Sequence, residues 1–290
     1  MTEPCPVLLP DSYPEAARLM AEYGGEARIL GGGQSLSLLM RMGMIEPAAL
    51  ISLRRCPDAT TATPVEGALR IGARFTVTDT AGLGYGYLAV ADAAAQVASP
   101  HVRNIGSVVG NVCHADPAND MAVPLLCHGA RVVLVSESGE RECPIAEFLT
   151  GPYESAVGDE EFARELRVPA LPGWLGAYRK IVWRSADHPV SGVAAALHTQ
   201  AGVVTDARFA LGGALGIPRL LPEVAAAVIG LPVAQAPAAA RAAAADLLPG
   251  LPVLGEGEDD MPAAYRRKVS VVLAGDAAAA ALGVNERSGR

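Results

Sequence analysis

Apolar positions at the beginning of the chain change from helical to strand spacing. Residues 16–23 place apolar side chains three or four positions apart, after Ser12 and Glu15 with the spacing of a capping box. Two glycines at 24–25 then predict the end of this helix. The pattern beyond it predicts, in order, a strand, a glycine turn, a short helix and a second strand, at 27–30, 31–34, 35–42 and 49–53.

The middle of the chain combines regular patterns with stretches rich in turn residues. The regular patterns predict a strand, an alanine-rich helix and a hairpin that turns at Ser138 and Gly139, over 68–80, 87–99 and 130–145. Residues 103–127 are rich in residues typical of turns. Residues 151–173 end in a cluster of proline and glycine and predict a linker.

The pattern changes again from Trp174. Three apolar segments with short polar breaks predict antiparallel strands, at 176–184, 191–200 and 203–213. Alanine-rich helices are expected between Pro222 and residue 282, with a loop and then a helix over 234–248. The C-terminal part of the chain is therefore predicted to form a sheet followed by helices.

The amino-acid composition is that of a folded protein, and the net charge argues against two classes of binding partner. With 290 residues, 51% of them hydrophobic and 19% charged, the chain suits two or three domains with buried cores. A net charge of −8 argues against a nucleic-acid partner or an anionic membrane surface. The sequence contains no apolar run of about 18 residues and no signal-peptide pattern, so we expect a cytoplasmic protein with no membrane span.

The residue types that carry metal or nucleophile chemistry are scattered. The five cysteines form no C-x-x-C pair, which argues against a disulfide framework, a zinc site or an iron–sulfur set. The histidines lack metal-ligand spacing, and the sequence shows no Ser-His-Asp triad. We therefore expect no metal site and no catalytic residue in this chain, so that any redox chemistry belongs to a bound cofactor.

Three glycine-rich segments are candidates for binding a phosphate. Residues 82–87 do not follow a strand and residues 211–218 run into proline, so both predict simple turns. Residues 31–34 lie between a strand and a helix, where successive amides converge on phosphate oxygens. Gln34 and Ser35 add side-chain donors. By itself, the segment is equally typical of a tight β–α turn.

A second donor-rich segment changes that balance. Residues 103–111 contain two glycines, two asparagines and a serine, and are expected to expose backbone amides suited to a second phosphate or a ribityl chain. Asp120 precedes a predicted helix, where it either caps the helix or holds a ribose hydroxyl. Two separate donor-rich turns imply an elongated ligand with two phosphates.

Both segments match motifs of a known family. Residues 31–36 resemble an A-G-G-[QH]-S-L turn, and 103–111 with 115–120 resemble R-N-x-G-T-I-G-G-N followed by A-D-P-x-x-D. Weaker matches follow in order, at 177–197, 209–220 and 263–277. The chain therefore resembles the FAD-binding medium subunit of molybdenum hydroxylases, of the carbon-monoxide dehydrogenase medium-chain and xanthine dehydrogenase FAD-subunit type.

The resemblance implies an α+β fold with FAD as its cofactor. A PCMH-type FAD-binding domain in two subdomains, 1–55 and 56–172, is expected before a C-terminal α+β domain of antiparallel strands and helices over 173–290. The cofactor-binding residues that the resemblance implies are Ile29, Leu30, Gly31, Gly32, Gly33, Gln34, Ser35, Leu36, Ser107, Val108, Gly110, Asn111, Asp120 and Lys180.

Within that set, the resemblance assigns different parts of FAD to different residues. The first motif would wrap the pyrophosphate and ribityl region, and residues 107–111 would line the other side. Asp120 would meet a ribose or ribityl hydroxyl. Lys180 would approach the isoalloxazine ring, unless it is an ordinary surface lysine on a strand.

Two positions depart from the family pattern. Val109 replaces a glycine, so its isopropyl group is expected to meet a cofactor atom that normally packs against bare backbone. His188 and Pro189 follow Asp187 where the family continues into a plain strand, which predicts altered geometry there.

The function implied is that of an FAD-dependent oxidoreductase subunit. In the family, electrons leave a substrate at molybdenum in a large subunit, cross the iron–sulfur centres of a small subunit, and reach FAD in the medium subunit. They then pass to NAD, quinone or oxygen. Two alternatives remain open from the sequence: a stand-alone flavoenzyme acting on a small organic substrate, and a scaffold that has lost FAD.

Overall fold

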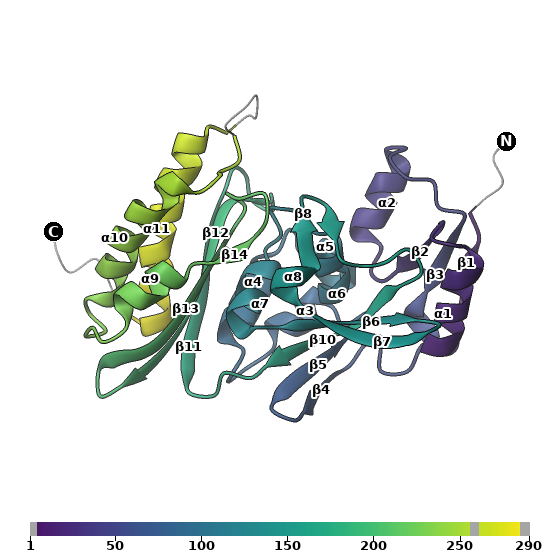
Figure 1. The fold of residues 1–290 in the computed structure, drawn as a ribbon, viewed down its shortest axis with the longest axis horizontal. Coiled ribbons are helices and arrows are strands. Elements are labelled where there is room, and N and C mark those ends of the chain that lie inside the picture. The colour runs from purple at the N-terminus through teal and green to yellow at the C-terminus, as the bar shows by residue number, and fades with distance from the viewer. Residues whose placement is uncertain (1–4, 256–260, 285–290) are drawn as a thin grey trace.

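The computed structural model describes residues 5–255 and 261–284 and divides into three blocks along its long axis (Figure 1). A small parallel sheet with two helices forms the N-terminal block, at the purple end of the molecule. The middle block holds a five-stranded antiparallel sheet, and the C-terminal block holds a four-stranded antiparallel sheet covered by longer helices. The predicted α+β fold class is confirmed.

The N-terminal block has the predicted helix and strand–turn–helix–strand order. Ser12 begins the first helix by accepting at Oγ from the amide of Glu15, 3.3 Å away, while the Glu15 carboxylate accepts from the amide of Asp11. The sheet has the order β1-β3-β2, and β1 was not predicted. The elements are β1 (Val7–Leu8), α1 (Tyr13–Glu22), β2 (Ala27–Leu30), α2 (Gln34–Arg41), β3 (Ala49–Ser52) and a 3₁₀ turn at Leu53–Arg55.

The middle block is built on a sheet of order β4-β5-β10-β6-β7. The predicted hairpin is confirmed as β6 and β7, and the helix predicted after Asp120 is α7. The rest of the turn-rich region contains two short helices that were not predicted, α5 and α6. The strands are β4 (Ala62–Val65), β5 (Ala68–Gly72), β6 (Arg131–Ser136), β7 (Gly139–Pro144), β10 (Phe162–Pro169) and a separate pair, β8 (Leu149–Gly151) and β9 (Glu154–Ser155). The helices are α3 (Val77–Ala81), α4 (Leu88–Gln96), α5 (Pro100–Ile105), α6 (Val108–Cys113), α7 (Ala122–His128) and α8 (Ile145–Phe148).

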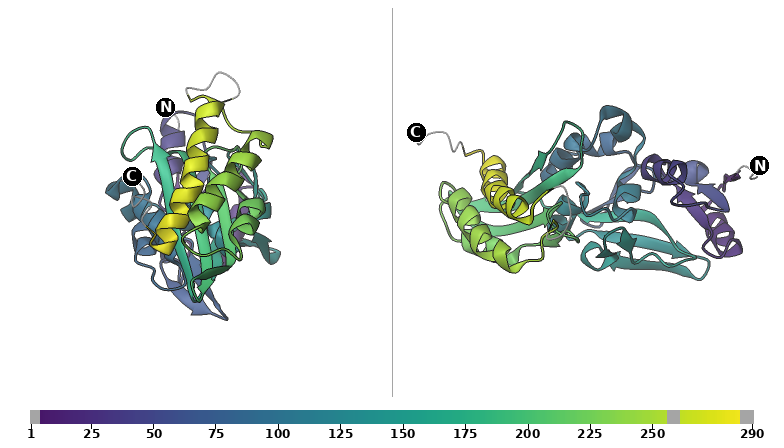
Figure 2. Two further views of the ribbon diagram at one scale, coloured as in Figure 1. Left: turned by 90° about the vertical axis from the view of Figure 1, so that its left-hand side faces the viewer. Right: turned by 90° about the horizontal axis from the view of Figure 1, so that it is seen from above.

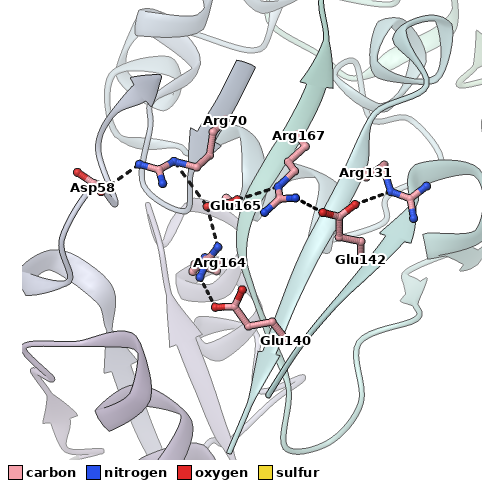
Figure 3. Close-up of polar contacts among 8 residues, drawn as sticks. All are labelled: Asp58, Arg70, Arg131, Glu140, Glu142, Arg164, Glu165 and Arg167. Atoms are coloured by element: carbon pink, nitrogen blue, oxygen red, sulfur yellow. Dashed lines mark hydrogen bonds and ion pairs between the residues drawn. The ribbon is translucent and has the colours of Figure 1, made fainter. Parts of the chain in front are cut away.

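The prediction of a linker over 151–173 is wrong, because this segment contains β10 at the centre of the sheet. The strand is hard to recognise because charged residues alternate with apolar ones along it. Leu166 packs into the core, whereas Glu165 on the opposite face is a carboxylate that is only 4% exposed. Figure 3 shows the reason: arginines of β5 and β10 surround Glu165, and the ion pairs continue to glutamates of β7.

The C-terminal block is a sheet of order β11-β12-β13-β14 that is buried on both faces. Figure 2 shows the helices of this block over one face. Along β12, Ala194 and Ala196 pack into the core of the middle block, while Val193, Ala195 and Leu197 pack under the C-terminal helices. The elements are β11 (Trp174–Val182), β12 (Pro189–Gln200), β13 (Val203–Gly212), β14 (Arg219–Leu220), α9 (Pro222–Val228), α10 (Ala236–Leu247), a 3₁₀ turn at Leu248–Gly250 and α11 (Ala263–Leu282).

The division into domains at 55 and 172 stays a prediction, although β11 begins the third sheet at Trp174. The outermost predicted residues, 1–4 and 285–290, lie outside the described part of the chain. Within the described ranges, no helix has the length and apolar character needed to cross a membrane.

The buried His128, at the end of α7, predicts a loss of stability in acid. Its Nδ1 lies 2.9 Å from the carbonyl oxygen of Pro169, its ring stacks on Tyr87, and burial lowers its pKa from 6.5. In acid, His128 therefore takes up a proton more readily in the unfolded chain than in the folded one. The stability that neutral His128 contributes to the fold is fully present above pH 6.5, and it is lost as the pH falls toward the lowered pKa of the folded state. We expect His128→Asn to lose less unfolding free energy than wild type between about pH 7.5 and 5.5 in urea titrations. Equal losses would contradict this assignment.

Candidate functional site

The two predicted glycine motifs lie against each other at the junction of the N-terminal and middle blocks. A β-carbon on Gly32 would overlap the carbonyl oxygen of Ile105 and lie 2.7 Å from Cα of Gly106. A β-carbon on Gly31 would lie 2.9 Å from Oγ of Ser107. Only glycine permits backbones to approach this closely, so the first turn is shaped to fit the second.

The amino end of α2 begins at this junction without a side-chain cap. Gly33, at the N-cap position, has a left-handed conformation with φ of 72°, and no side chain in the described ranges caps the first turn of the helix. The amides of that turn, at 34–36, are uncompensated donors at the positive end of the helix dipole. Gln34 folds back toward the carbonyl oxygen of Gly32, with Nε2 at 3.4 Å. This geometry fits an anion such as a phosphate.

The second motif does not offer the free amides that its composition predicts. It forms α6, and Ser107 caps this helix by accepting at Oγ from the amide of Gly110, 3.2 Å away. The amide of Asn111 donates to the carbonyl oxygen of Ser107, and the amide of Val108 donates to that of Phe75. These three amides are therefore used within the chain, and the expectation that they are exposed for a phosphate is wrong.

The expectation for Val109 is also wrong. The side chains of Val108, Val109 and Val112 all lie in the core of the middle block, and Val109 is 2% exposed. Helical periodicity explains this, because these positions share the inward face of α6 while Gly110 lies on the exposed face. The isopropyl group of Val109 therefore packs inside the protein and does not obstruct the junction.

Asn111 carries an unmatched buried group at this junction. Its Oδ1 is buried without a hydrogen-bond partner among the described residues, while its carbonyl oxygen accepts from Nδ2 of Asn119 at 2.5 Å. Asn119 also accepts at Oδ1 from the amides of Met121 and Ala122 at the start of α7. Asn119, rather than Asp120, therefore fills the capping role that the sequence left open for Asp120. An unsatisfied buried amide oxygen indicates a missing donor, such as a cofactor hydroxyl.

Asp120 and Lys180 meet where the C-terminal sheet packs on the middle block. Nζ of Lys180 lies 3.0 Å from Oδ1 and 3.1 Å from Oδ2 of Asp120, and the hydroxyl of Tyr178 donates to Oδ1 at 2.8 Å. The Asp120 side chain is 5% exposed and that of Lys180 9%, so the alternative of an ordinary surface lysine is wrong. Burial raises the pKa of Asp120, and Lys180, Tyr178 and His188 oppose that rise.

The sequence patterns missed two residues of this region. Arg74 lies between the blocks, and its Nε donates to the carbonyl oxygen of Gly31 at 3.4 Å. Tyr178 is fully buried beneath Asp120. The sequence indicates Tyr178 only through its position two residues before Lys180, because alternate residues of a strand lie on the same face.

A cleft elsewhere in the molecule is a weaker candidate for a ligand site. It has a volume of about 620 Å³ and lies between α1 and the β6–β7 hairpin. It contains none of the predicted cofactor-binding residues, and acidic side chains line it at Glu15, Glu137 and Glu140. An anionic cofactor is disfavoured there.

The family comparison identifies the cofactor of this chain. The family model described as the FAD binding domain in molybdopterin dehydrogenase matches residues 3–171, and the CO dehydrogenase flavoprotein C-terminal domain matches residues 176–281. The chain belongs to this flavoprotein family. FAD is therefore its cofactor, and the chain is part of an FAD-dependent oxidoreductase. The glycine contact, the uncapped α2 and the unpaired Asn111 oxygen fit such a group.

Named relatives of this flavoprotein family agree with the family match. The alpha subunit of the 6-hydroxypseudooxynicotine dehydrogenase complex of Paenarthrobacter nicotinovorans is 33% identical over 63% of this chain and 64% of its own length, slightly under two thirds of that relative. The carbon monoxide dehydrogenase medium chain of Hydrogenophaga pseudoflava is 31% identical over 70% of this chain and 72% of that protein. A solved structure of carbon monoxide dehydrogenase from the same organism, lacking the Mo-pyranopterin moiety, matches with a TM-score of 0.87, 28% identity and coverage of 98% of this chain and 99% of that one.

Proposed function

We propose that this chain is the FAD-binding subunit of a heteromeric molybdenum-hydroxylase-type oxidoreductase in the cytoplasm. Its electrons come from the iron–sulfur centres of a small partner subunit, after substrate oxidation in a molybdopterin-binding large subunit. They leave through FAD to an external acceptor: NAD, quinone or oxygen. The named relatives support this proposal because they are a medium chain and a subunit of a dehydrogenase complex.

The observation that carries the proposal is the contact between the two glycine motifs. The uncapped end of α2, with residues 31–36, holds the pyrophosphate, and Arg74 adds a positive charge beside Gly31. Ser107, Gly110 and Asn111 line the opposite side of the junction.

The remaining predicted residues take supporting roles at the glycine junction or bind FAD from the contact between the middle block and the C-terminal sheet. Ile29 and Leu30 end β2 and support the turn, and Val108 packs beneath it. Asp120 accepts a ribose or ribityl hydroxyl, and Lys180 brings a positive charge to the isoalloxazine side. The bound FAD supplies the electron-accepting and electron-donating chemistry, while the residues of this chain bind and orient it and exclude water.

The test is an absorption spectrum of the purified chain, with chromatography of any pigment released by heat. We expect oxidised flavin bands, about one FAD per chain, and co-purification with two further polypeptides, one of which carries iron–sulfur clusters. A colourless chain that does not take up added FAD would refute cofactor binding. A partner-free holoprotein that is bleached by a small organic substrate would refute the subunit role and favour a stand-alone flavoenzyme.

A further inference from the structure

We propose that Tyr178 is a positioning residue that holds the Asp120 carboxylate ready for the cofactor, through the hydrogen bond from its hydroxyl to Oδ1. The proposal rests on the proposed function, because it assigns Asp120 a cofactor hydroxyl as its ligand. It adds a residue outside the matched glycine motifs, and it places that residue in the C-terminal sheet.

Hydrogen bonds from the middle block hold the backbone of Tyr178 in place. Its amide donates to Oδ2 of Asp92 at 2.8 Å, and its carbonyl oxygen accepts from Nε2 of Gln96 at 3.1 Å. Both partners belong to α4, so β11 is fastened to this helix at the residue that contacts Asp120. The same carboxylate of Asp92 also pairs with Arg179, 2.8 Å away. The attachment of Tyr178 therefore does not depend on a ligand.

The ring of Tyr178 is fixed by the neighbouring strand. Gly192 of β12 lies beside it, and a β-carbon there would overlap the hydroxyl and lie 2.8 Å from Cζ of the ring. The ring is fully buried and packs in the core of the middle block. With backbone and ring both fixed, the buried hydroxyl is held where it donates to Asp120.

The hydrogen bonds around Asp120 leave room for one more donor. A carboxylate has about four acceptor sites. Oδ1 accepts from Tyr178 and contacts Lys180, and Oδ2 contacts only Lys180 among the described residues. One site on Oδ2 therefore remains for a ligand hydroxyl. Tyr178 occupies Oδ1 and so fixes which oxygen is presented.

The hydroxyl also favours the charged form of Asp120, because its hydrogen bond lowers the pKa of that carboxyl group. Burial favours the neutral acid and so raises the pKa of Asp120. Tyr178 and Lys180 of β11, and His188 of the segment before β12, lower this pKa. His114 and Asp116, on the segment that leads to Asp120, face His188 as well. Removing the Tyr178 donor raises the pKa of Asp120 further, because a hydrogen bond to the charged form is lost.

The decisive experiment measures the dissociation constant of FAD for wild type and for Tyr178→Phe from about pH 5 to 8. FAD is removed from the full-length subunit, and its rebinding is followed by flavin fluorescence. Phenylalanine keeps the ring and removes only the donor. We expect affinity to fall about tenfold near neutral pH, the cost of one hydrogen bond to a charged group. We also expect the acid-side loss of affinity to begin at a higher pH than in wild type.

Two further variants separate positioning from packing. Tyr87→Phe removes the hydroxyl of another tyrosine that packs against the same core, and should leave both affinity and pH profile unchanged. Asp120→Asn should weaken FAD binding at every pH and should remove the acid-side loss of affinity, because no carboxyl group titrates at position 120. The proposal would be overturned if Tyr178→Phe lowered FAD affinity by the same factor at every pH, or left the affinity unchanged. If wild type itself binds no FAD, the proposed function fails instead.

Discussion

Gly32→Ala is expected to abolish retention of FAD during purification. The added β-carbon would overlap the carbonyl oxygen of Ile105 and lie 2.7 Å from Cα of Gly106, and neither backbone atom can move as a flexible side chain can. The two glycine motifs must then separate, and the first turn loses its register with Asn111. We expect FAD affinity to fall on the order of 100-fold, which corresponds to about 2.8 kcal/mol of binding free energy. The measurement is the FAD content per chain and the dissociation constant on reconstitution.

Gly84→Ala is the matched control for this change. Gly84 also lies in a glycine-rich segment, but a β-carbon there meets nothing within 4 Å, and its φ is outside the left-handed region. We expect it to keep normal FAD content and stability. If Gly32→Ala retains FAD as the control does, the close contact of the two motifs is not required for binding.

The first motif could be predicted because its local pattern and its tertiary role agree. A strand, three glycines and an amphipathic helix follow one another, and the structure places α2 within one residue of the predicted range. What the sequence could not show is the partner of Gly32. That contact joins two segments far apart in the chain, and no local periodicity encodes it.

The second motif shows how composition misleads when a helix forms. Glycine, serine and asparagine between 103 and 111 indicated exposed amides, yet Ser107 caps α6 and the amides of that segment become internal donors. The helix also turns Val109 inward. An alternative prediction of a short helix starting at Ser107 would have placed both correctly, since S-x-x-G fits an N-cap followed by the first turn.

The missed strand β10 has a different cause. Its sequence, FARELRVP, carries charges at three of its eight positions, which is typical of a surface segment. The charges are compensated only after neighbouring strands assemble, when Arg70 of β5 and Glu142 of β7 come beside them. A burial pattern that depends on cross-strand ion pairs cannot be recognised from one strand alone.

That dependence leads to the second prediction with a large effect: Glu165→Ala is expected to destabilise the fold strongly. The Glu165 side chain is 5% exposed and meets three arginines, with Arg164 at 3.2 Å, Arg167 at 3.2 Å and Arg70 at 3.8 Å. Its removal leaves positive charges facing one another in a partly buried space, and Arg164 is itself only 18% exposed. Because Arg70 and Arg167 retain some solvent, we expect a loss of about 2–4 kcal/mol, somewhat below that of a fully buried pair.

The loss should appear as a fall in melting temperature of roughly 5–15 °C for a domain of this size. Glu140→Ala is the control, because Glu140 is 45% exposed and its one ion pair within the described part of the chain is with Arg164. Exposed pairs contribute less than about 1 kcal/mol. The effect of Glu165→Ala should reach the N-terminal block, since Arg164 also lies over the ring of Tyr13 in α1, 5.7 Å from its centroid. Equal melting temperatures for the two variants would mean that the arginines are satisfied by water, and that the sheet does not need this carboxylate at its centre.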